Sequence, residues 1–244
     1  MAVDTTLKAL LVLAAVLAPA IARGQAAGES ARPEGAPPAE DLYMPHPSDI
    51  VIVEGWPSVG KWMIDRGMQP ASWLGARVGG KPVREPINVV LVDARATSAP
   101  EATARLVEAC RAAGFKSREG HSGGYRGYLG GVLFHQLPET EGHAFSDEPF
   151  EMRNNHGRVF GPLALKEGWM FIAAFSRERF EPLARPEHMY VSFNEAREAF
   201  ARRLEAATDY AVAARVSLGN ALGGDAEFTT GDHDGVAVVL RAQR

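Results

Sequence analysis

The sequence predicts a single α+β domain built in the order strand, helix, two strands, helix, strand. Three observations support this fold class. Apolar runs of strand length alternate with segments whose apolar residues recur every three or four positions. Two serine–glutamate pairs have the spacing of helix capping boxes. The chain has 244 residues and a formal net charge of only −4, and this length is sufficient for one hydrophobic core of ordinary size. We therefore predict a split βαβ, or ferredoxin-like, two-layer sandwich with one added C-terminal strand.

The first half of the predicted sandwich begins with a buried strand. Residues 86–93, "PINVVLVD", form a continuous run rich in β-branched side chains. Ser98 and Glu101 then fit a capping box, which predicts that a helix begins there, and Gly114 supplies its stop. The apolar stripe of this amphipathic helix consists of Leu106, Ala109, Cys110 and Ala113.

The second half repeats this pattern. The runs "GRVFGPLAL" (157–165) and "WMFIAAFSRE" (169–178) predict two strands around a turn. Ser192 and Glu195 form the second capping box. The last two predicted strands are "AVAARVSL" (211–218) and "GVAVVLRA" (235–242). The second helix has an apolar stripe made of Phe193, Ala196, Phe200, Leu204 and Ala207.

Two other segments complete the predicted domain of residues 49–244. Residues 115–154 read as a long glycine-rich insertion between the first helix and the next strand. Residues 49–80 predict a short strand and a helix that begins near Pro57, as a small N-terminal helical appendage.

The same N-terminal segment contains a spacing typical of phosphate-binding loops. Gly55, Gly60 and Lys61 fit G-x-x-x-x-G-K. However, Trp62 stands where magnesium binding needs Ser or Thr, and Pro57 removes one backbone N–H donor. We therefore predict no nucleotide binding, and the near-neutral charge balance gives no sign of nucleic-acid binding.

The N-terminal end predicts export. Lys8 precedes the short apolar run 9–18, and residues 20–22 supply the small-x-small pattern of a signal-peptidase site. Residues 1–22 are therefore predicted to be a signal peptide, and the Pro/Ala/Gly-rich residues 23–48 a flexible linker. The apolar run is too short for a stable membrane span. No cysteine follows it to carry a lipid, since Cys110 is the only cysteine. We expect a periplasmic or secreted protein without an internal disulfide.

Four motifs of the predicted domain resemble the bacterial LssY C-terminal domain family over about residues 86–241. They are "EPINVVLVDARA", "NNHGRVFGP", "HMYVSFNEAREAF" and "TTGDHDGVAVVL", in this order along the chain. The resemblance implies the fold and a cell-envelope setting, while the biochemical role of the family is not established. The chain departs from the expected paired histidines at Asn155-His156 and Glu187-His188.

One candidate nucleophile lies in the insertion. Gly120, Ser122 and Gly124 satisfy the G-x-S-x-G pattern of a nucleophile elbow, which would make Ser122 a catalytic serine. Its partners would be His233 with Asp225 or Asp232, following the chain order Ser, acid, His. The alternative is a glycine-rich loop, because no buried strand precedes the motif and glycines are too frequent after it for a helix.

Polar histidines form the second candidate site. Neutral imidazoles gathered from several strands suit a divalent metal or a general base, and His121, His156, His188 and His233 lie in Gly- or Asn-containing motifs. Arg158 shares a strand face with His156. The turn 231–235 offers Asp232, His233 and Asp234 as metal ligands, or else it is a plain Asp-Gly turn.

Two function hypotheses follow. The first is an exported, non-catalytic module that binds an envelope component or a small ligand through its Gly/Tyr-rich insertion and histidine-bearing edge. The second is a hydrolase or metal-assisted enzyme. The sequence implies no cofactor beyond the possibility of a divalent metal. The residues assigned to ligand binding are Tyr125, Tyr128, Asn155 and His188, and those assigned to catalysis are His121, Ser122, His156, Arg158 and His233.

Overall fold

The computed structural model describes residues 44–184 and 187–242. The predicted signal peptide and residues 23–43 of the predicted linker lie outside this part of the chain. The described residues all belong to one compact unit, Arg32–Arg244. In chain order its elements are η1 (Pro47–Asp49), β1 (Ile50–Val51), β2 (Val59–Gly60), β3 (Ser72–Val78), β4 (Lys81–Arg84), β5 (Val89–Asp93), α1 (Ala99–Ala112), β6 (Lys116–Arg118), β7 (Arg126–Leu129), β8 (Val132–Leu137), β9 (Ala144–Ser146), β10 (Asn154–Leu165), β11 (Gly168–Phe180), β12 (His188–Ser192), α2 (Phe193–Ala207), β13 (Tyr210–Ser217) and β14 (Val236–Ala242).

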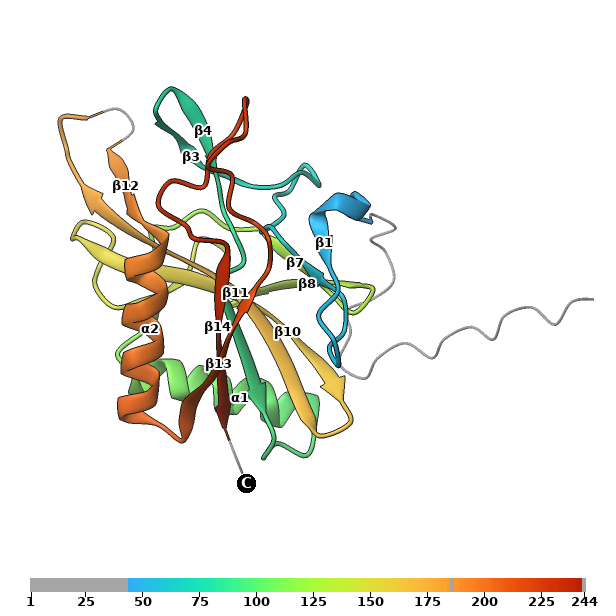
Figure 1. The fold of residues 1–244 in the computed structure, drawn as a ribbon. Helices are drawn as coiled ribbons and strands as arrows, with labels where there is room; N and C mark the ends of the chain where they lie inside the picture. Colours follow the sequence, from blue (N-terminus) through green and yellow to red (C-terminus); the bar gives the residue numbers. More distant parts are fainter. Residues whose placement is uncertain (1–43, 185–186, 243–244) are drawn as a thin grey trace, which may run out of the picture. The chain divides into compact units, whose positions relative to one another are not determined.

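Twelve of these strands form one curled sheet (Figure 1). Its main path runs β1-β2-β7-β8-β10-β11-β5-β14-β13, with β12 paired to β11 and β9 joining β6 to β10. The β14–β5 pair is parallel, whereas the pairs β10–β11, β11–β5 and β13–β14 are antiparallel. Strands β3 and β4 form a separate hairpin.

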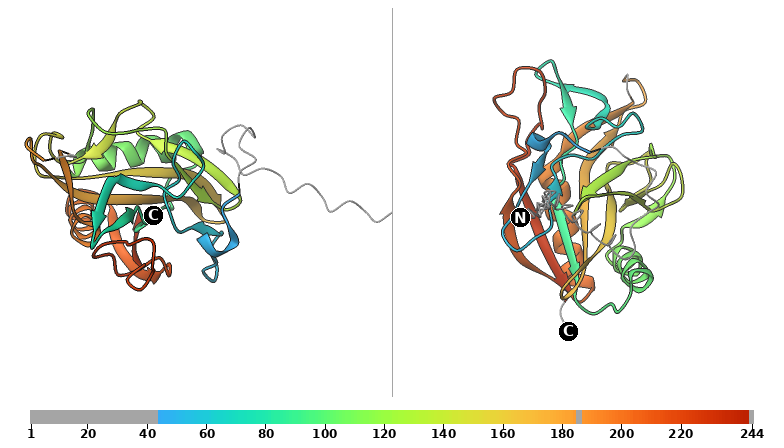
Figure 2. Two further views of the ribbon diagram at one scale, coloured as in Figure 1. Left: turned by 90° about the horizontal axis from the view of Figure 1, so that it is seen from above. Right: turned by 90° about the vertical axis from the view of Figure 1, so that its right-hand side faces the viewer.

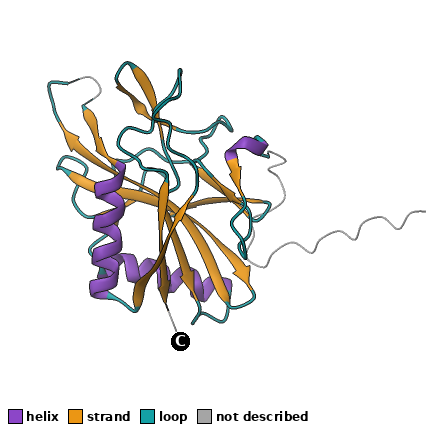
Figure 3. Cartoon of the chain, in the orientation of Figure 1, coloured by secondary structure: helices purple, strands orange, loops and turns teal. Residues whose placement is uncertain are grey.

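The predicted ferredoxin-like sandwich is wrong. The last strand, β14, lies between β5 and β13, so β14 and not β13 pairs with β5. On the other side, β8, β7, β2 and β1 extend the sheet beyond β10. The described residues contain two α-helices against this large sheet, and the fold is mainly β (Figure 3). The insertion at residues 115–154 is responsible for much of the difference, because it contributes the four strands β6–β9.

The central strands of the sheet are buried on both faces. Along β5, Val89 and Leu91 share a core cluster with both helices, whereas Val90 and Val92 belong to a second cluster with Val59 of β2. Strands β11 and β14 alternate in the same way. Strands that are covered on both faces read as continuous apolar runs, which explains the unbroken "VVLV" of β5. Figure 2 shows the sheet and the two helices from two further sides.

The two predicted N-cap serines begin both helices, whereas the glutamates bond to Thr97 and Arg177 and do not complete the capping boxes. Ser98 Oγ accepts a hydrogen bond from the Glu101 backbone N–H at 3.3 Å, and Ser192 Oγ accepts one from Glu195 at 2.9 Å. Gly114 follows α1 with a φ of 86°, a conformation that glycine adopts without strain.

The predicted helix near Pro57 is absent. Residues 50–60 instead form the β1–β2 hairpin, in which Ile50 pairs with Gly60. Its turn uses Gly55 at a φ of 77°, which is incompatible with a right-handed helix. The Gly and Lys residues with the spacing of a phosphate-binding loop therefore lie in a hairpin, without the helix N-terminus that holds a phosphate.

Among the described residues, neither helix has the length and apolarity needed to cross a bilayer.

The helix-facing core gives a direct test of this packing. Leu106 of α1 is fully buried, whereas its neighbour Val107 is 40% exposed. We expect Leu106→Ala to lower the free energy of unfolding by about 2–5 kcal/mol, because it removes buried methyl groups and leaves a cavity. Urea denaturation measures this difference. Val107→Ala is the matched control and should change stability by less than about 0.5 kcal/mol; equal effects would contradict the assigned face of α1.

Candidate functional site

Strands β10 and β11 bring polar side chains together on the sheet face opposite the helices. His156 is paired in register with Ser176, and Asn154 is paired with Glu178. Alternate residues of a strand share a face, so Arg158 lies on the same side as these pairs. All five of these side chains are buried. A buried polar row of this kind is unfavourable unless its members bond to one another or to a ligand.

His156 is held at both ring nitrogens. Its Nδ1 lies 2.9 Å from Asn154 Oδ1, and its Nε2 lies 3.3 Å from Ser176 Oγ. Asn154 uses its amide N–H to donate to Glu178 Oε1 at 2.8 Å, so its Oδ1 is the acceptor. Trp73 Nε1 donates to Ser176 Oγ at 3.0 Å, which leaves the serine hydroxyl free to donate to the imidazole. The network therefore assigns a neutral His156 that carries its proton on Nδ1.

His121 approaches His156 from the loop between β6 and β7. The two rings stack, with centroids 4.6 Å apart and planes at 30°. Nε2 of His121 is buried and has no hydrogen-bond partner. A Cβ at Gly120 would lie 2.3 Å from the ring of Phe150, so only glycine lets this loop lie so close. Phe150 in turn stacks on His188 at 5.5 Å.

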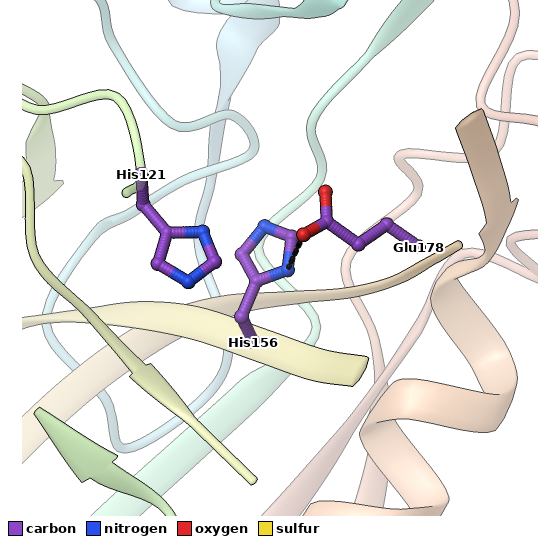
Figure 4. Close-up of side chains that lie close together, drawn as sticks. All are labelled: His121, His156 and Glu178. Carbon is purple, nitrogen blue, oxygen red and sulfur yellow. Dashed lines mark ion pairs between the residues drawn. The ribbon is translucent and has the colours of Figure 1, made fainter. Parts of the chain in front are cut away.

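Glu178 completes the cluster. Its carboxylate lies 3.7 Å from His156 Nδ1 and 3.3 Å from His188 Nδ1. His156 lies between His121 and Glu178 (Figure 4). Ligand atoms from His121, His156 and Glu178 all lie within 4.8 Å of one another, and among the described residues they are the one such group able to hold a metal ion. We call these three residues the His2Glu cluster.

Burial controls the protonation of this cluster. Burial and then the positive charge of Arg158 lower the pKa of His121 to about 3. Burial also lowers the pKa of His156 well below its usual value, with further contributions from His121 and Arg158. Both imidazoles are therefore neutral at physiological pH, the form that binds metal ions. Burial raises the pKa of Glu178, and this effect outweighs the hydrogen bond from Asn154, which lowers the pKa.

A second polar group, formed by Ser122, Tyr125 and Arg158, adjoins the cluster. Arg158 donates to the Ser122 backbone carbonyl at 2.6 Å, and its guanidinium lies 4.7 Å from the centre of the Tyr125 ring. The hydroxyls of Ser122 and Tyr125 are 2.8 Å apart. Tyr125 also lines a cleft of about 1260 Å³ between α1, β7 and β8. Glu85 is also buried, and burial raises its pKa to about 7, although the positive charge of Arg158 acts in the opposite direction.

Ser122 does not stand in a nucleophile elbow. β6 ends at Arg118 and β7 begins at Arg126, so the motif lies in a loop between two strands, with no helix after it. The Ser122 hydroxyl contacts Tyr125 and Arg158, whereas His233, its proposed base, is engaged elsewhere.

The predicted ligand loop at residues 231–235 is separate from the His2Glu cluster. His233 Nε2 lies 2.9 Å from Asn220 Oδ1. Asp234 accepts a hydrogen bond from Arg197 at 2.7 Å. Asp232 accepts hydrogen bonds from Tyr190, Ser192 and the first backbone N–H of α2, at Phe193. The loop thus fastens β14 to the start of α2, and each of its carboxylates has a protein partner.

Two residues assigned to ligand binding lie away from the cluster. Asn155 points to the helix-facing side, where its amide donates to Asp147 at 2.7 Å. Tyr128 is buried in a small apolar cluster with Ile64 and Leu133.

Sequence reasoning missed four members of the site: Trp73, Glu85, Ser176 and Glu178. The only local signal for any of them is the two-residue period of β11, which places Ser176 and Glu178 on one face, opposite His156 and Asn154 of β10.

Comparison with known proteins gives no further guide: no family model, curated protein or solved structure matches the chain. Its function is therefore argued from the chemistry of the His2Glu cluster and its surroundings.

The capping role of Asp232 predicts a pH-dependent contribution to stability. Burial alone would raise the pKa of Asp232, but hydrogen bonds from Ser192, Tyr190 and the Phe193 backbone outweigh it and lower the pKa. We expect Asp232→Ala to cost about 1–2 kcal/mol at neutral pH. This contribution is fully present above the unfolded-state pKa of about 4 and is lost as the pH falls through the lower folded-state value.

Urea denaturation of the wild type and of Asp232→Ala between pH 3 and 7 measures this contribution. Glu54→Ala, at an exposed carboxylate in the β1–β2 turn, is the control. A destabilisation by Asp232→Ala that is the same at pH 3 and pH 7 would show that the carboxylate charge is not what caps α2.

Proposed function

We propose that this protein is an exported domain that binds a divalent transition-metal ion, most simply zinc, at His121, His156 and Glu178. The observation that carries the proposal is the convergence of three ligand atoms within 4.8 Å. The ligands come from three segments that are distant in the chain: the β6–β7 loop, β10 and β11.

The donor set suits this class of metal. Two neutral imidazoles and one carboxylate favour zinc or a similar first-row ion over calcium or magnesium, which prefer oxygen ligands alone. Since both histidines are already neutral, metal binding need not release a proton from either ring to solvent, although an ion at Nδ1 of His156 requires its proton to move to Nε2.

Metal binding has an identifiable cost at His156. Both of its ring nitrogens have hydrogen-bond partners, so the ion must replace either Asn154 or Ser176. The partner that remains would orient the ring, as outer residues do in known metal sites. His121 has no such cost, because its Nε2 is already without a partner. It must only turn its ring edge toward the ion, out of the stack with His156.

Three protein ligands leave room for a further ligand on the ion. In zinc proteins this arrangement is typical of catalytic sites, whereas structural sites have four protein ligands. The cluster is thus compatible with both hypotheses drawn from the sequence, a module that binds an envelope component or small ligand and a metal-assisted enzyme. The predicted export signal and the resemblance to the LssY C-terminal domain family are the grounds for proposing that the protein lies in the periplasm or outside the cell.

Metal titration of tag-free protein tests the proposal. After dialysis against chelator and removal of the chelator, calorimetry with zinc should give about one bound ion per chain. His121→Ala, His156→Ala and Glu178→Gln should each weaken binding by more than about 100-fold, since each removes a ligand.

His135→Ala is the matched control, because His135 is an exposed histidine on β8 outside the cluster. It should leave zinc affinity unchanged. Circular dichroism of each variant verifies that it is folded. Absence of zinc binding, or zinc binding that survives all three ligand substitutions, would refute the site.

A further inference from the structure

Arg158 is a buried cation without an ionic partner. It is 3% exposed, and its Nε is buried without any hydrogen-bond partner. Its protein contacts are the backbone carbonyl and hydroxyl of Ser122, at 2.6 and 3.4 Å, and the ring of Tyr125. Among the described residues, no carboxylate forms a salt bridge with it. A buried charge left in this state is strongly unfavourable unless something else neutralises it.

Arg197 shows how this protein treats a buried arginine elsewhere. It is equally buried, at 3% exposure. Its guanidinium donates to both carboxylate oxygens of Asp234, at 2.7 and 3.1 Å, and also to Glu198 and to the carbonyl of Val236. By comparison, Arg158 lacks the carboxylate partners that Arg197 has.

Two acidic residues near Arg158 do not serve as its ionic partner. Glu85 and Glu178 act on Arg158 only through space, and neither accepts a hydrogen bond from it. Neither carboxylate therefore neutralises the Arg158 guanidinium through a direct contact.

We propose that Arg158 binds an oxyanion, the carboxylate or phosphate group of a ligand, together with the hydroxyls of Ser122 and Tyr125. A guanidinium offers parallel N–H donors that match two oxygens of such a group. The two hydroxyls, 2.8 Å apart, offer further donors beside it. Tyr125 belongs both to this group and to the wall of the cleft, so it connects the two.

This proposal goes beyond metal binding and does not depend on it. Arg158 is not a member of the His2Glu cluster, and its unpaired charge is a property of the metal-free protein. If both proposals hold, the ligand presents its anionic group to Arg158, two residues along β10 from a metal ligand.

The experiment measures oxyanion binding to metal-free wild-type protein in the presence of chelator. Inorganic phosphate and acetate are the two probes, followed by calorimetry and by the rise in Tm that a ligand of the folded state produces. We expect saturable binding of at least one probe, with phosphate alone indicating a phosphate ligand and acetate alone a carboxylate ligand. Arg158→Lys should bind at least tenfold more weakly, and Arg158→Met should not bind.

A purely structural arginine would behave differently. If Arg158 is an unpaired buried charge, Arg158→Met should keep or raise the Tm measured without anion. If Arg158 only fastens the loop through Ser122 and Tyr125, the same change should lower the Tm, and anions should have no effect on the wild type. That result, or anion binding that survives in Arg158→Met, would overturn the proposal.

One control and one further variant complete the design. Arg202→Met removes an exposed arginine from α2 and should leave oxyanion binding unchanged. Ser122→Ala removes the hydroxyl but keeps the backbone carbonyl, so it should weaken binding without affecting the fold. Zinc titration of Arg158→Lys should still give one ion per chain, so failure of the oxyanion proposal is distinguishable from failure of the metal proposal.

Discussion

The antiparallel pairing of β10 with β11 is the constraint on which the rest of the structure depends. These are the two longest strands, and their register sets which side chains face the helices and which face the opposite side. A shift of one residue would move His156 and Arg158 into the apolar helix-facing core. It would also bring Val159, which packs with the helices, to the polar face. The apolar core and the polar site therefore specify the same register from opposite faces of one sheet.

The polar face is stable because nearly all of its members are bonded. Trp73, Ser176, His156, Asn154 and Glu178 form one chain of hydrogen bonds. Such networks in a low-dielectric interior are favourable when complete and costly when broken. Two members of this face, His121 and Arg158, each have a buried nitrogen without a partner; among the described residues, four other such atoms belong to Arg84, Asn194, Tyr210 and His233. A buried polar group without a partner needs an explanation, and a bound ligand would supply one at His121 and Arg158.

Local sequence signals predicted the individual elements better than their assembly. The two serine N-caps, the buried run of β5 and the hairpin strands β10 and β11 are all present, because caps and periodicity act over a few residues. The architecture was wrong because strand order depends on pairing between distant segments. Nothing local indicates that β14 pairs in parallel with β5, or that short strands such as β6 and β9 join the sheet. Near Pro57, the turn at Gly55 and pairing with β7 overrode a helix signal.

The sequence by itself determined the residue types of the site and one piece of its geometry: the two-residue period of a strand puts His156 and Arg158 on one face. Only the tertiary structure decided which histidines converge. It brings His121 and Glu178 to His156, turns Asn155 to the other face and leaves His233 bonded to Asn220. The physical reason is that periodicity orients a side chain relative to its own strand, whereas convergence depends on contacts between segments far apart in the chain.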